Sequence, residues 1–596
     1  MPSYKAPVAD SVFLLSDVFD YARYGNLPRF SEAPLDLVEQ VLNEGGKFAE
    51  EVLQPLNLSG DAEGCKRHED GSVTTPKGFK EAYKAYVEGG WVGVSGDPEF
   101  GGQGLPYFLS VALSEYSISA NQAFAMYPGL TNGAGAALQV HGTSELKAAY
   151  LPKLISGQWT GTMNLTEPHC GTDLGLLKSK AAKQADGSYQ ISGQKIFISA
   201  GEHDLAENII HLVLARIEGA PAGVKGISLF LVPKFIPDSA GNPGVRNGVT
   251  CGSIERKMGI HGNSTCVLNY DDATGWLIGE EHRGLNAMFV MMNGARLGVA
   301  VQGLSISEVA YQNAAAYAKD RLQGRSLTGA KEPGKAADPL IVHPDVRRML
   351  LEIRSFNEAA RALMIWTALT EDEALGSADA AQRQAADDRL GLLTPIIKGV
   401  FTDMGFANAV KAQQVLGGHG YIHEWGMEQF VRDARIAMIY EGANGIQALD
   451  LVGRKLPKDG GRAVRAMFAE IDAFAKANAG EAELAPYLAA VKTGVGQLQQ
   501  ATMWLMQNGL ANPENAGAAS TDYMHLFGLT LLAFMWAKIA KAALARRAAG
   551  TADERIEAKL TLAKFFGERM MPEAAAHLAR LTTGAATMMS MPAAAF

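Results

Sequence analysis

The sequence predicts an α+β fold in which a helical domain, a central β-domain and a helical bundle follow one another, with an additional helical domain at the C-terminal end. Three observations lead to this prediction. Apolar residues recur at helical spacing up to about residue 157, strand-like runs with turn residues fill about 158 to 280, and long helical patterns occupy the rest. The alternating strand–helix units of a dinucleotide-binding sheet are missing, so a Rossmann NAD site is not expected.

The chain has 596 residues, which is too long for a single core. The changes in pattern place the domain borders. We expect an N-terminal extension at 1–34, an N-terminal helical domain at 35–157, a β-domain at 158–280, a four-helix-type bundle at 281–455 and an extra helical domain at 456–596.

Individual segments support these assignments. Val38 and Leu42 belong to a helical pattern in the first helical domain. In the β-domain, Asp186–Gly187 separates two strand-like runs and predicts a hairpin turn. Residues 209–215 and 227–232 are continuous apolar runs, which are typical of buried strands.

The composition argues against several classes of protein. The net charge is -9 and there is no long Lys/Arg run, so a nucleic-acid partner is not expected. The most apolar stretch, 524–537, is shorter than the roughly 18 residues of a membrane span and predicts a buried helix. The four cysteines form no CxxC pair, which favours a reducing compartment and predicts no metal site. The N-terminus lacks a basic signal segment, so we expect a cytoplasmic protein.

Two segments of the β-domain are candidates for ligand binding. Residues 164–175 contain Pro168, Gly171 and Gly175, which predict a loop whose backbone can approach a flat ligand closely. Residues 193–201 form a strand that ends in an aromatic ring and a hydroxyl, suited to the face and polar edge of a flavin. Taken alone, the first segment is equally compatible with a junction that binds no ligand, and the second is better explained as an ordinary half-buried strand.

Two further candidates lie in the helical bundle. Glu441 follows an uncharged run and precedes Gly442 and Gly445, which suggests a carboxylate on a loop that faces a cleft. Arg296 and Arg321 are expected on one long helix, where Arg321 could bind a pyrophosphate. A solvated surface acid and surface salt bridges are the simpler alternatives.

Together these segments resemble the acyl-CoA dehydrogenase family. The resemblance covers roughly residues 35 to 455, and its motifs occur in the family's order and with its spacing. The matching segments are Thr166–Asp173, Gly193–Ser199, Lys257–Cys266, Gly294–Arg296, Tyr317–Gly324, Gln414–Gly418 and Ile439–Gly442. The family's fold is a helical domain, a β-domain and a helical bundle, as the pattern predicts.

The resemblance implies a role for each candidate residue. FAD is the implied cofactor, and Phe197 stands where the family usually has Trp. The residues implied to contact the flavin are Met163, Leu165, Thr166, Phe197 and Ser199. The residues implied to hold the FAD of a neighbouring subunit are Arg321, Gln323, Gln414 and Gly418. The residues implied to bind substrate are Thr172, Arg296, Tyr440 and Gly442. A homo-oligomer therefore follows, with a dimer favoured.

The resemblance also implies the chemistry. Glu441 would take the α-proton of an acyl-CoA thioester while the flavin accepts the β-hydride, so the base and the flavin must face opposite sides of the substrate. The apolar run before Glu441 would raise the pKa of its carboxyl group and suit it to this task. The electrons would then pass to an electron-transfer flavoprotein.

Both ends of the chain exceed the family's common length. They resemble a long subfamily that includes 3-(methylthio)propanoyl-CoA dehydrogenases, used in bacterial breakdown of dimethylsulfoniopropionate. A short-chain acyl-CoA is therefore the expected substrate. The alternatives are a long-chain or broad-range dehydrogenase, an acyl-CoA oxidase, and a DNA-associated relative. The last should carry a basic tract, whereas residues 460–596 hold 13 Lys and Arg against 11 Asp and Glu.

Overall fold

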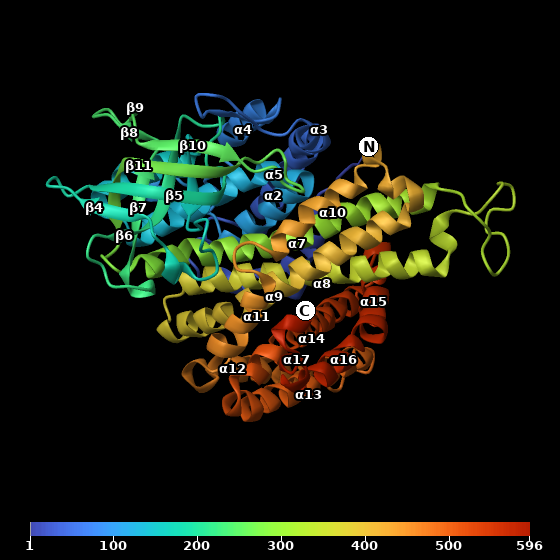
Figure 1. Cartoon of the computed structure of the whole chain (residues 1–596). Helices are drawn as coiled ribbons and strands as arrows, with labels where there is room; N and C mark the ends of the chain where they lie inside the picture. Colours follow the sequence, from blue (N-terminus) through green and yellow to red (C-terminus); the bar gives the residue numbers. More distant parts are fainter. Residues whose placement is uncertain (1) are drawn as a thin grey trace. The chain divides into compact units, whose positions relative to one another are not determined.

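The computed structural model describes residues 2–596, which form two compact units. A mixed unit comprises Glu44–Gly298 and contains the β-sheet. A helical unit comprises the described residues up to Asn43 together with Val299–Phe596. The mixed unit is drawn mainly in blue to green, and the C-terminal helices of the helical unit in orange to red (Figure 1).

The sheet of the mixed unit closes on itself. Strand β11 pairs with β5, β5 with β4, β4 with β6, β6 with β7, and β7 with β11 again, while β10 and β3 add to this ring. Closure gives each ring strand a partner on both sides over part of its length. The main strands are β3 Trp159–Asn164, β4 Lys180–Lys183, β5 Tyr189–Ser199, β6 Asn208–Ile217, β7 Ile227–Pro233, β10 Val249–Ile254 and β11 Thr265–Ile278. The short ones are β1 Lys66–Arg67, β2 Val73–Thr74, β8 Phe235–Pro237 and β9 Pro243–Arg246.

The central strands are apolar on both faces because each face is covered. Ile210 and Leu212 of β6 pack into one apolar cluster, whereas Val213 and Ala215 of the same strand pack into another. The predicted hairpin is confirmed, since β4 and β5 pair antiparallel with Lys183 opposite Tyr189. Residues 209–215 and 227–232 are buried strands, as predicted.

Helices cover this sheet. Ala134 and Leu138 of α5 share an apolar cluster with β6, and so does Leu151 of α6. The bounds are α3 Asn57–Glu63, α4 Phe79–Glu88, α5 Tyr107–His141 and α6 Ser144–Ser156. Two helices run across the unit borders, α2 at Leu35–Phe48 and α7 at Gly284–Asp320.

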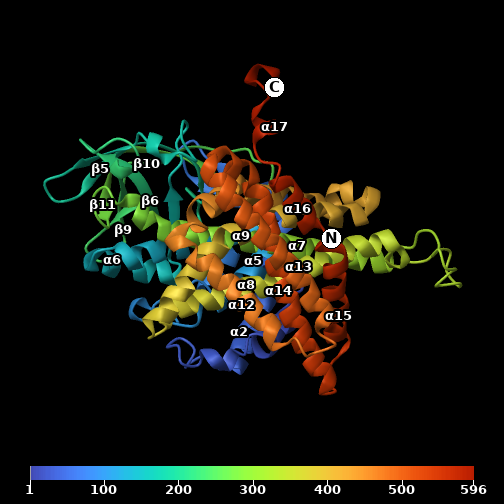
Figure 2. The same ribbon diagram turned by 90° about the horizontal axis from the view of Figure 1, so that it is seen from below.

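The helical unit is built around long helices. Its bounds are α1 Val8–Phe13, α8 Pro344–Gly376, α9 Ala380–Val415, α10 Met427–Arg435, α11 Asn444–Asp450, α12 Arg462–Ala477, α13 Ala485–Trp504, α14 Pro513–Ala548, α15 Glu554–Phe565, α16 Glu573–Leu581 and α17 Ala586–Met589. The C-terminal helices pack around α14, and the chain end after α16 extends away from them (Figure 2).

Two of these helices have the length and hydropathy of a membrane span. The most apolar windows of α9 and α14 are, however, 61% and 89% buried within the structure. Core helices of this length pass the same test, so the finding is weak evidence for a span. The predicted buried helix at 524–537 is confirmed as the middle of α14.

Both ends of the chain are joined to the bundle by a buried charge network. Asp10 of α1 accepts a hydrogen bond from Arg361 of α8 at 2.8 Å and another from Lys559 of α15. Arg361 also reaches Glu308 of α7, and Lys559 reaches Glu358 of α8. Burial alone would raise the pKa of Asp10, but Lys559 and Arg361 hold it well below its usual value. Each buried charge is therefore paired.

One sequence prediction about α7 is wrong in detail. Arg296 lies on this helix, but the helix ends at Asp320, and Arg321 lies in the loop that follows. Pro339 pairs with Leu322, and the Asp338 side chain accepts backbone hydrogen bonds from Ser326 and from Lys331. These bonds compete with helix continuation and give the loop a defined shape, extended away from α7 and α8 (Figure 1).

Candidate functional site

In the mixed unit, the loop after β3 is fastened to β5 by a buried lysine. The Lys195 ammonium donates to the carbonyl oxygen of Leu165 at 3.0 Å and to the Glu167 carboxylate at 2.8 Å. The Ile196 amide donates to the carbonyl oxygen of Thr166 at 2.9 Å. Thr166 is therefore held beside the end of β5, where Phe197 and Ser199 lie.

The Lys195–Glu167 pair is deeply buried, with side chains 0% and 3% exposed. Glu167 also accepts from the Ser179 hydroxyl at 2.6 Å and from the Lys178 amide at 2.8 Å. Burial lowers the pKa of Lys195 to about 8, and Glu167 opposes this shift. Burial would raise the pKa of Glu167, but Lys195 and the hydrogen bonds hold it below its usual value. Both groups are therefore charged at neutral pH.

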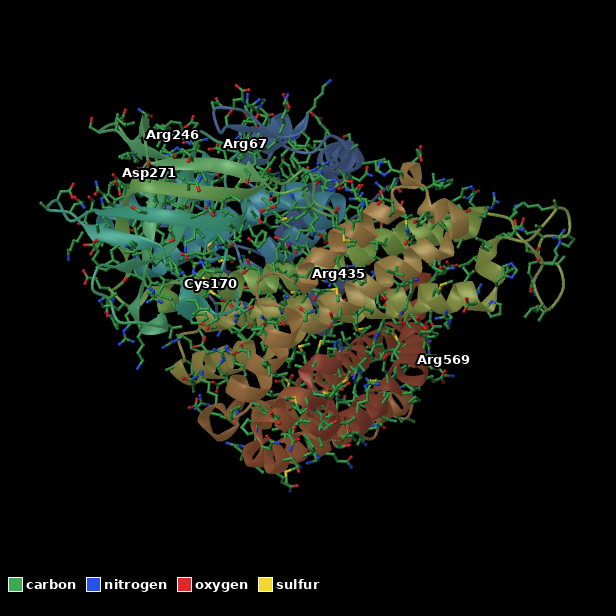
Figure 3. All side chains as sticks on the ribbon, in the orientation of Figure 1. Arg67, Cys170, Arg246, Asp271, Arg435 and Arg569 are labelled. Carbon is green, nitrogen blue, oxygen red and sulfur yellow. The ribbon has the colours of Figure 1, made fainter. Side chains whose placement is uncertain are left out.

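Glu167 also begins a tight turn with His169 and Cys170. Glu167 and Cys170 exchange two backbone hydrogen bonds, and Cys170, labelled in Figure 3, closes the turn. The ligand atoms of these three residues lie within 4.8 Å of one another, close enough for a metal ion. The Glu167 oxygens already accept hydrogen bonds from Lys195 and Ser179, so a cation would compete with those donors.

Phe197 has an unusual backbone conformation. Its φ is 59°, in the left-handed region that bulky residues avoid. The register of β5 against β11 shifts here, because Ile198 faces Cys266 but Lys195 faces Leu268. This bulge turns the ring outward, so that Phe197 is 60% exposed at the end of the strand. An exposed aromatic ring on the strand that ends at Ser199, with Thr166 held to the same strand by Ile196, is suited to a flat, partly polar ligand.

The remaining predicted residues of this unit lie nearby in sequence or on α7. Met163 is half-buried on β3, opposite Leu212 of β6. Thr172 is exposed in the loop after the 167–170 turn. Arg296 is buried on α7, and its Nη1 lies 3.5 Å from the Asn293 side-chain oxygen.

In the helical unit, Glu441 lies on a loop between α10 and α11 and is half-buried. Its φ is 58°, and Gly442 follows with φ 84°. A left-handed conformation at a glutamate is strained, and such strain often occurs at functional sites. The neighbouring Tyr440 donates a 2.5 Å hydrogen bond to Gln302 of α7, and burial raises the pKa of its hydroxyl well above the usual value.

Two buried side chains hold the carbonyl groups of this loop. The Lys398 ammonium donates to the carbonyl oxygen of Gly442 at 2.8 Å. The Gln447 amide lies 3.3 Å from the carbonyl oxygen of Glu441 and 3.4 Å from that of Gly442. Both side chains are fully buried.

The four predicted residues at the other end of the bundle are exposed. Gln323 lies in the loop after α7, Gln414 near the end of α9, and Gly418 in the turn that follows. Tyr317 of α7 hydrogen-bonds His419 at 2.7 Å, which brings this turn to the end of α7. No hydrogen bond or ion pair involves the Arg321 guanidinium within residues 2–596. Arg321 is thus available to an anionic group.

These features fit the parts of an FAD molecule. The exposed Phe197 ring and the nearby hydroxyls match the flavin ring, and the unpartnered Arg321 guanidinium matches a pyrophosphate. Sequence reasoning assigned no role to Lys195, Lys398 or Gln447. A lysine inside an apolar run was the available signal, as in Pro395-Ile-Ile-Lys-Gly-Val-Phe401.

Known protein families match this chain domain by domain. Four family descriptions match in order: the acyl-CoA dehydrogenase N-terminal domain at 39–158, its middle domain at 162–273, its C-terminal domain at 282–456, and the acetyl-CoA dehydrogenase C-terminal-like domain at 467–592.

Individual relatives match over nearly the whole chain. A 3-methylmercaptopropionyl-CoA dehydrogenase of Ruegeria pomeroyi is 43% identical, covering 97% of this chain and 98% of that one. A broad-specificity linear acyl-CoA dehydrogenase of Mycobacterium tuberculosis is 36% identical, covering 96% of each. The fold matches a structure of an acyl-CoA dehydrogenase from Bacillus anthracis complexed with FAD, with a TM-score of 0.74 and 21% identity over 96% of this chain and 91% of that chain.

Family profiles that together span most of the chain, and a relative of similar length at 43% identity, leave one interpretation of the fold. The chain belongs to the acyl-CoA dehydrogenase family and is an FAD-dependent oxidoreductase that dehydrogenates acyl-CoA thioesters.

Proposed function

We propose that Glu441 is the base that removes the α-proton of the acyl-CoA. The observation that carries this role is its strained backbone: a glutamate with φ 58° is held in place by donors to the carbonyl groups of residues 441 and 442. Such strain is stable only where the surroundings enforce it. A fixed carboxylate meets the first requirement of a general base, which is a set position relative to the proton it takes.

We assign the FAD-binding residues of the two units to different parts of the cofactor site. Phe197 presents its ring to the flavin, while Met163, Leu165, Thr166 and Ser199 contact its edge. Arg321, Gln323, Gln414 and Gly418 bind the FAD of a neighbouring subunit. When bound, FAD supplies the acceptor for the β-hydride. Lys195 keeps Thr166 in position by holding the backbone before it.

Substrate binding falls to four further residues in this proposal. Gly442 lets the chain turn directly after the base. Tyr440, the residue before the base, is held by its hydrogen bond to Gln302. Thr172 is exposed on its loop and contacts the CoA chain. Arg296 contributes a buried positive charge on α7.

The substrate we propose is 3-methylmercaptopropionyl-CoA. The support is the 43% identity to a dehydrogenase of that name over essentially the full length of both chains. The γ-thioether sulfur is soft and apolar, so an apolar pocket accepts it much as it accepts a short alkyl chain. A broad-specificity linear acyl-CoA dehydrogenase is the second candidate, supported by the 36% identical relative of similar length.

A steady-state screen of acyl-CoAs with an artificial electron acceptor tests the substrate. Discrimination by one methylene or sulfur is worth roughly 1–3 kcal/mol, so several short acyl-CoAs should react, with 3-methylmercaptopropionyl-CoA among the best. The value of kcat/KM should fall steeply for long chains. A value that instead rises toward palmitoyl-CoA would favour the long-chain or broad-range alternative. Oxygen consumption in the same assay separates an oxidase from an enzyme that reduces an electron-transfer flavoprotein.

We also propose a cytoplasmic homo-oligomer, with a dimer favoured. The unpartnered Arg321 on its shaped loop supports a subunit that completes its neighbour's FAD site. Arg321→Ala should therefore lower FAD retention and weaken subunit association together, as measured by flavin absorbance and sedimentation across a dilution series. A monomer that holds FAD normally would contradict the shared site.

A further inference from the structure

A chain of polar contacts starts at the Glu441 loop, fully buried at Lys398 and partly buried beyond it. Helices α9, α11 and α14 of the helical unit pack against one another (Figure 1). From α9, the Lys398 ammonium reaches the carbonyl oxygen of Gly442 and the side-chain oxygen of Asn444, each at 2.8 Å. Lys398 is fully buried within the apolar part of α9. These acceptors at the loop and at the start of α11 are thus part of what compensates the buried charge.

The same contacts continue into the C-terminal helices. The Asn444 amide donates to Asp403 of α9 at 2.7 Å, and the other Asp403 oxygen lies 2.9 Å from Nε2 of His525 in α14. The His525 ring stacks on His577 of α16, with centroids 5.4 Å apart and planes at 11°. His577 is itself fixed by Asp522 at 2.7 Å. The loop that carries Glu441 is therefore connected to α14 and α16 through side chains alone.

This connection acts where the backbone is under strain. Glu441 and Gly442 are successive residues with positive φ, and only the glycine adopts that conformation without cost. A hydrogen bond from a charged donor is stronger than one between neutral groups. The bond from Lys398 to the Gly442 carbonyl therefore fixes the peptide that follows Gly442, and the Gln447 amide lies 3.3 Å from the Glu441 carbonyl of the preceding peptide. Together these donors restrict the backbone that carries the Glu441 side chain.

We propose that Lys398 is a positioning residue for Glu441. Lys398, Asn444, Asp403 and His525 together form what we call the clamp, through which the C-terminal helices help to orient the Glu441 side chain. The inference rests on the proposed role of Glu441 in proton abstraction. Lys398 does not touch substrate; it acts through the Gly442 carbonyl and Asn444. In this view the additional C-terminal helices are part of the catalytic apparatus of the chain.

The test uses the full-length, FAD-loaded protein mixed rapidly with butanoyl-CoA in the absence of oxygen. Lys398→Met should lower the rate constant of flavin bleaching by about 10- to 100-fold, because a small misplacement of a catalytic group costs up to about that much. The bleaching amplitude and the dissociation constant for butanoyl-CoA should stay unchanged. Hydrogen exchange of the amides at 440–446 should become faster, which reports the loosened loop directly.

A matched control lies on the same helix. Lys411 of α9 is partly exposed and pairs with Glu352 at 2.9 Å. Lys411→Met removes a lysine charge without touching the clamp and should leave the rate constant unchanged.

A second pair of variants addresses the C-terminal helices. His525→Phe removes the donor to Asp403 and should lower the rate constant by about 3- to 10-fold, the worth of one hydrogen bond. His525→Gln restores a donor and should recover most of the rate.

Each outcome decides the proposal. A Lys398→Met protein with a smaller amplitude but an unchanged rate constant has a folding defect only, and overturns the clamp. If that variant yields no folded protein, the His525 pair decides: equal rates in His525→Phe and wild type overturn the proposal. Glu441→Gln is measured alongside. If it bleaches flavin at the wild-type rate, the proposed function itself fails, whereas an inactive Glu441→Gln with a fully active Lys398→Met refutes the clamp alone.

Discussion

Phe197 and Glu441 both have left-handed backbones, yet the two positions are held by different means. Phe197 sits in a β-bulge, and the hydrogen-bond ladders on either side of the bulge define it. Glu441 sits on a loop, where the side chains of Lys398 and Gln447 hold the backbone. A ladder is made of main-chain groups and tolerates most single substitutions. A loop held by side chains does not. Single substitutions around the Glu441 loop should therefore lower the reaction rate more than single substitutions around Phe197.

The largest effect should follow from changing the base itself. Glu441→Gln removes the proton acceptor but keeps the size and the hydrogen-bonding capacity of the side chain. Activity should fall by about 10²–10⁴ or more, the usual contribution of a positioned base. Because FAD is assigned to other residues, flavin content and acyl-CoA binding should be retained. Steady-state rates and flavin spectra check both expectations, and wild-type turnover would place the base elsewhere.

Lys195→Met should show that the mixed unit depends on one side-chain pair despite its ladder. The change leaves the Glu167 carboxylate buried without its cation, which typically costs about 3–5 kcal/mol of unfolding free energy. The loop at Leu165 and Thr166 would lose its anchor, so FAD content should fall as well. Urea unfolding and flavin absorbance measure the two effects.

The double variant Glu167→Gln with Lys195→Met is the matched control for that prediction. It removes both charges together, so much of the lost stability should return. A single Lys195→Met variant within about 1 kcal/mol of wild type would contradict the role of the pair, because a buried ion that loses its partner should cost more than that.

The same contrast explains what sequence reasoning could and could not predict. The order of helices and strands follows from periodicity, which is a local property; the 184–188 turn and the buried strands β6 and β7 are examples. The motifs predict Glu441, Thr166 and Phe197 as candidate site residues. The motifs do not predict the backbone conformations of these residues. The φ angle of Phe197, for example, depends on how its strand pairs with a distant strand.

The contacts that hold these residues are also distant in sequence. Lys398 lies 44 residues from Gly442, and Lys195 lies 28 residues from Glu167. A buried lysine in an apolar run signals that some partner exists, but the sequence does not name the partner. The end of α7 shows the same limit, since Arg321 leaves the helix because of hydrogen bonds made by Asp338, 17 positions further on.

The prediction with the smallest effect at neutral pH concerns acid and is confined to the mixed unit. His211 of β6 is fully buried, and burial, with Lys234 and Arg246 nearby, lowers the pKa of its ring to about 3. His203, which hydrogen-bonds Thr160, has its pKa lowered to about 3 in the same way, chiefly by burial. Both rings are therefore neutral in the folded state at pH values where an unfolded chain takes up protons.

Acid should therefore destabilise the mixed unit through these two rings. Between pH 6.5 and about 3, the unfolded state binds one more proton per histidine than the folded state, so stability falls as the pH is lowered. Well between the two pKa values each histidine should contribute a slope of about 1.4 kcal/mol per pH unit, and this slope fades as the pH rises through 6.5. His211→Asn keeps a polar group beside Thr162 but cannot titrate, so it should reduce the measured slope by that amount, and His203→Asn should do the same.

Urea unfolding at several pH values, followed by flavin release, measures the slope. An unchanged slope in both variants would mean that carboxylates such as Glu167 account for all the acid sensitivity of this unit.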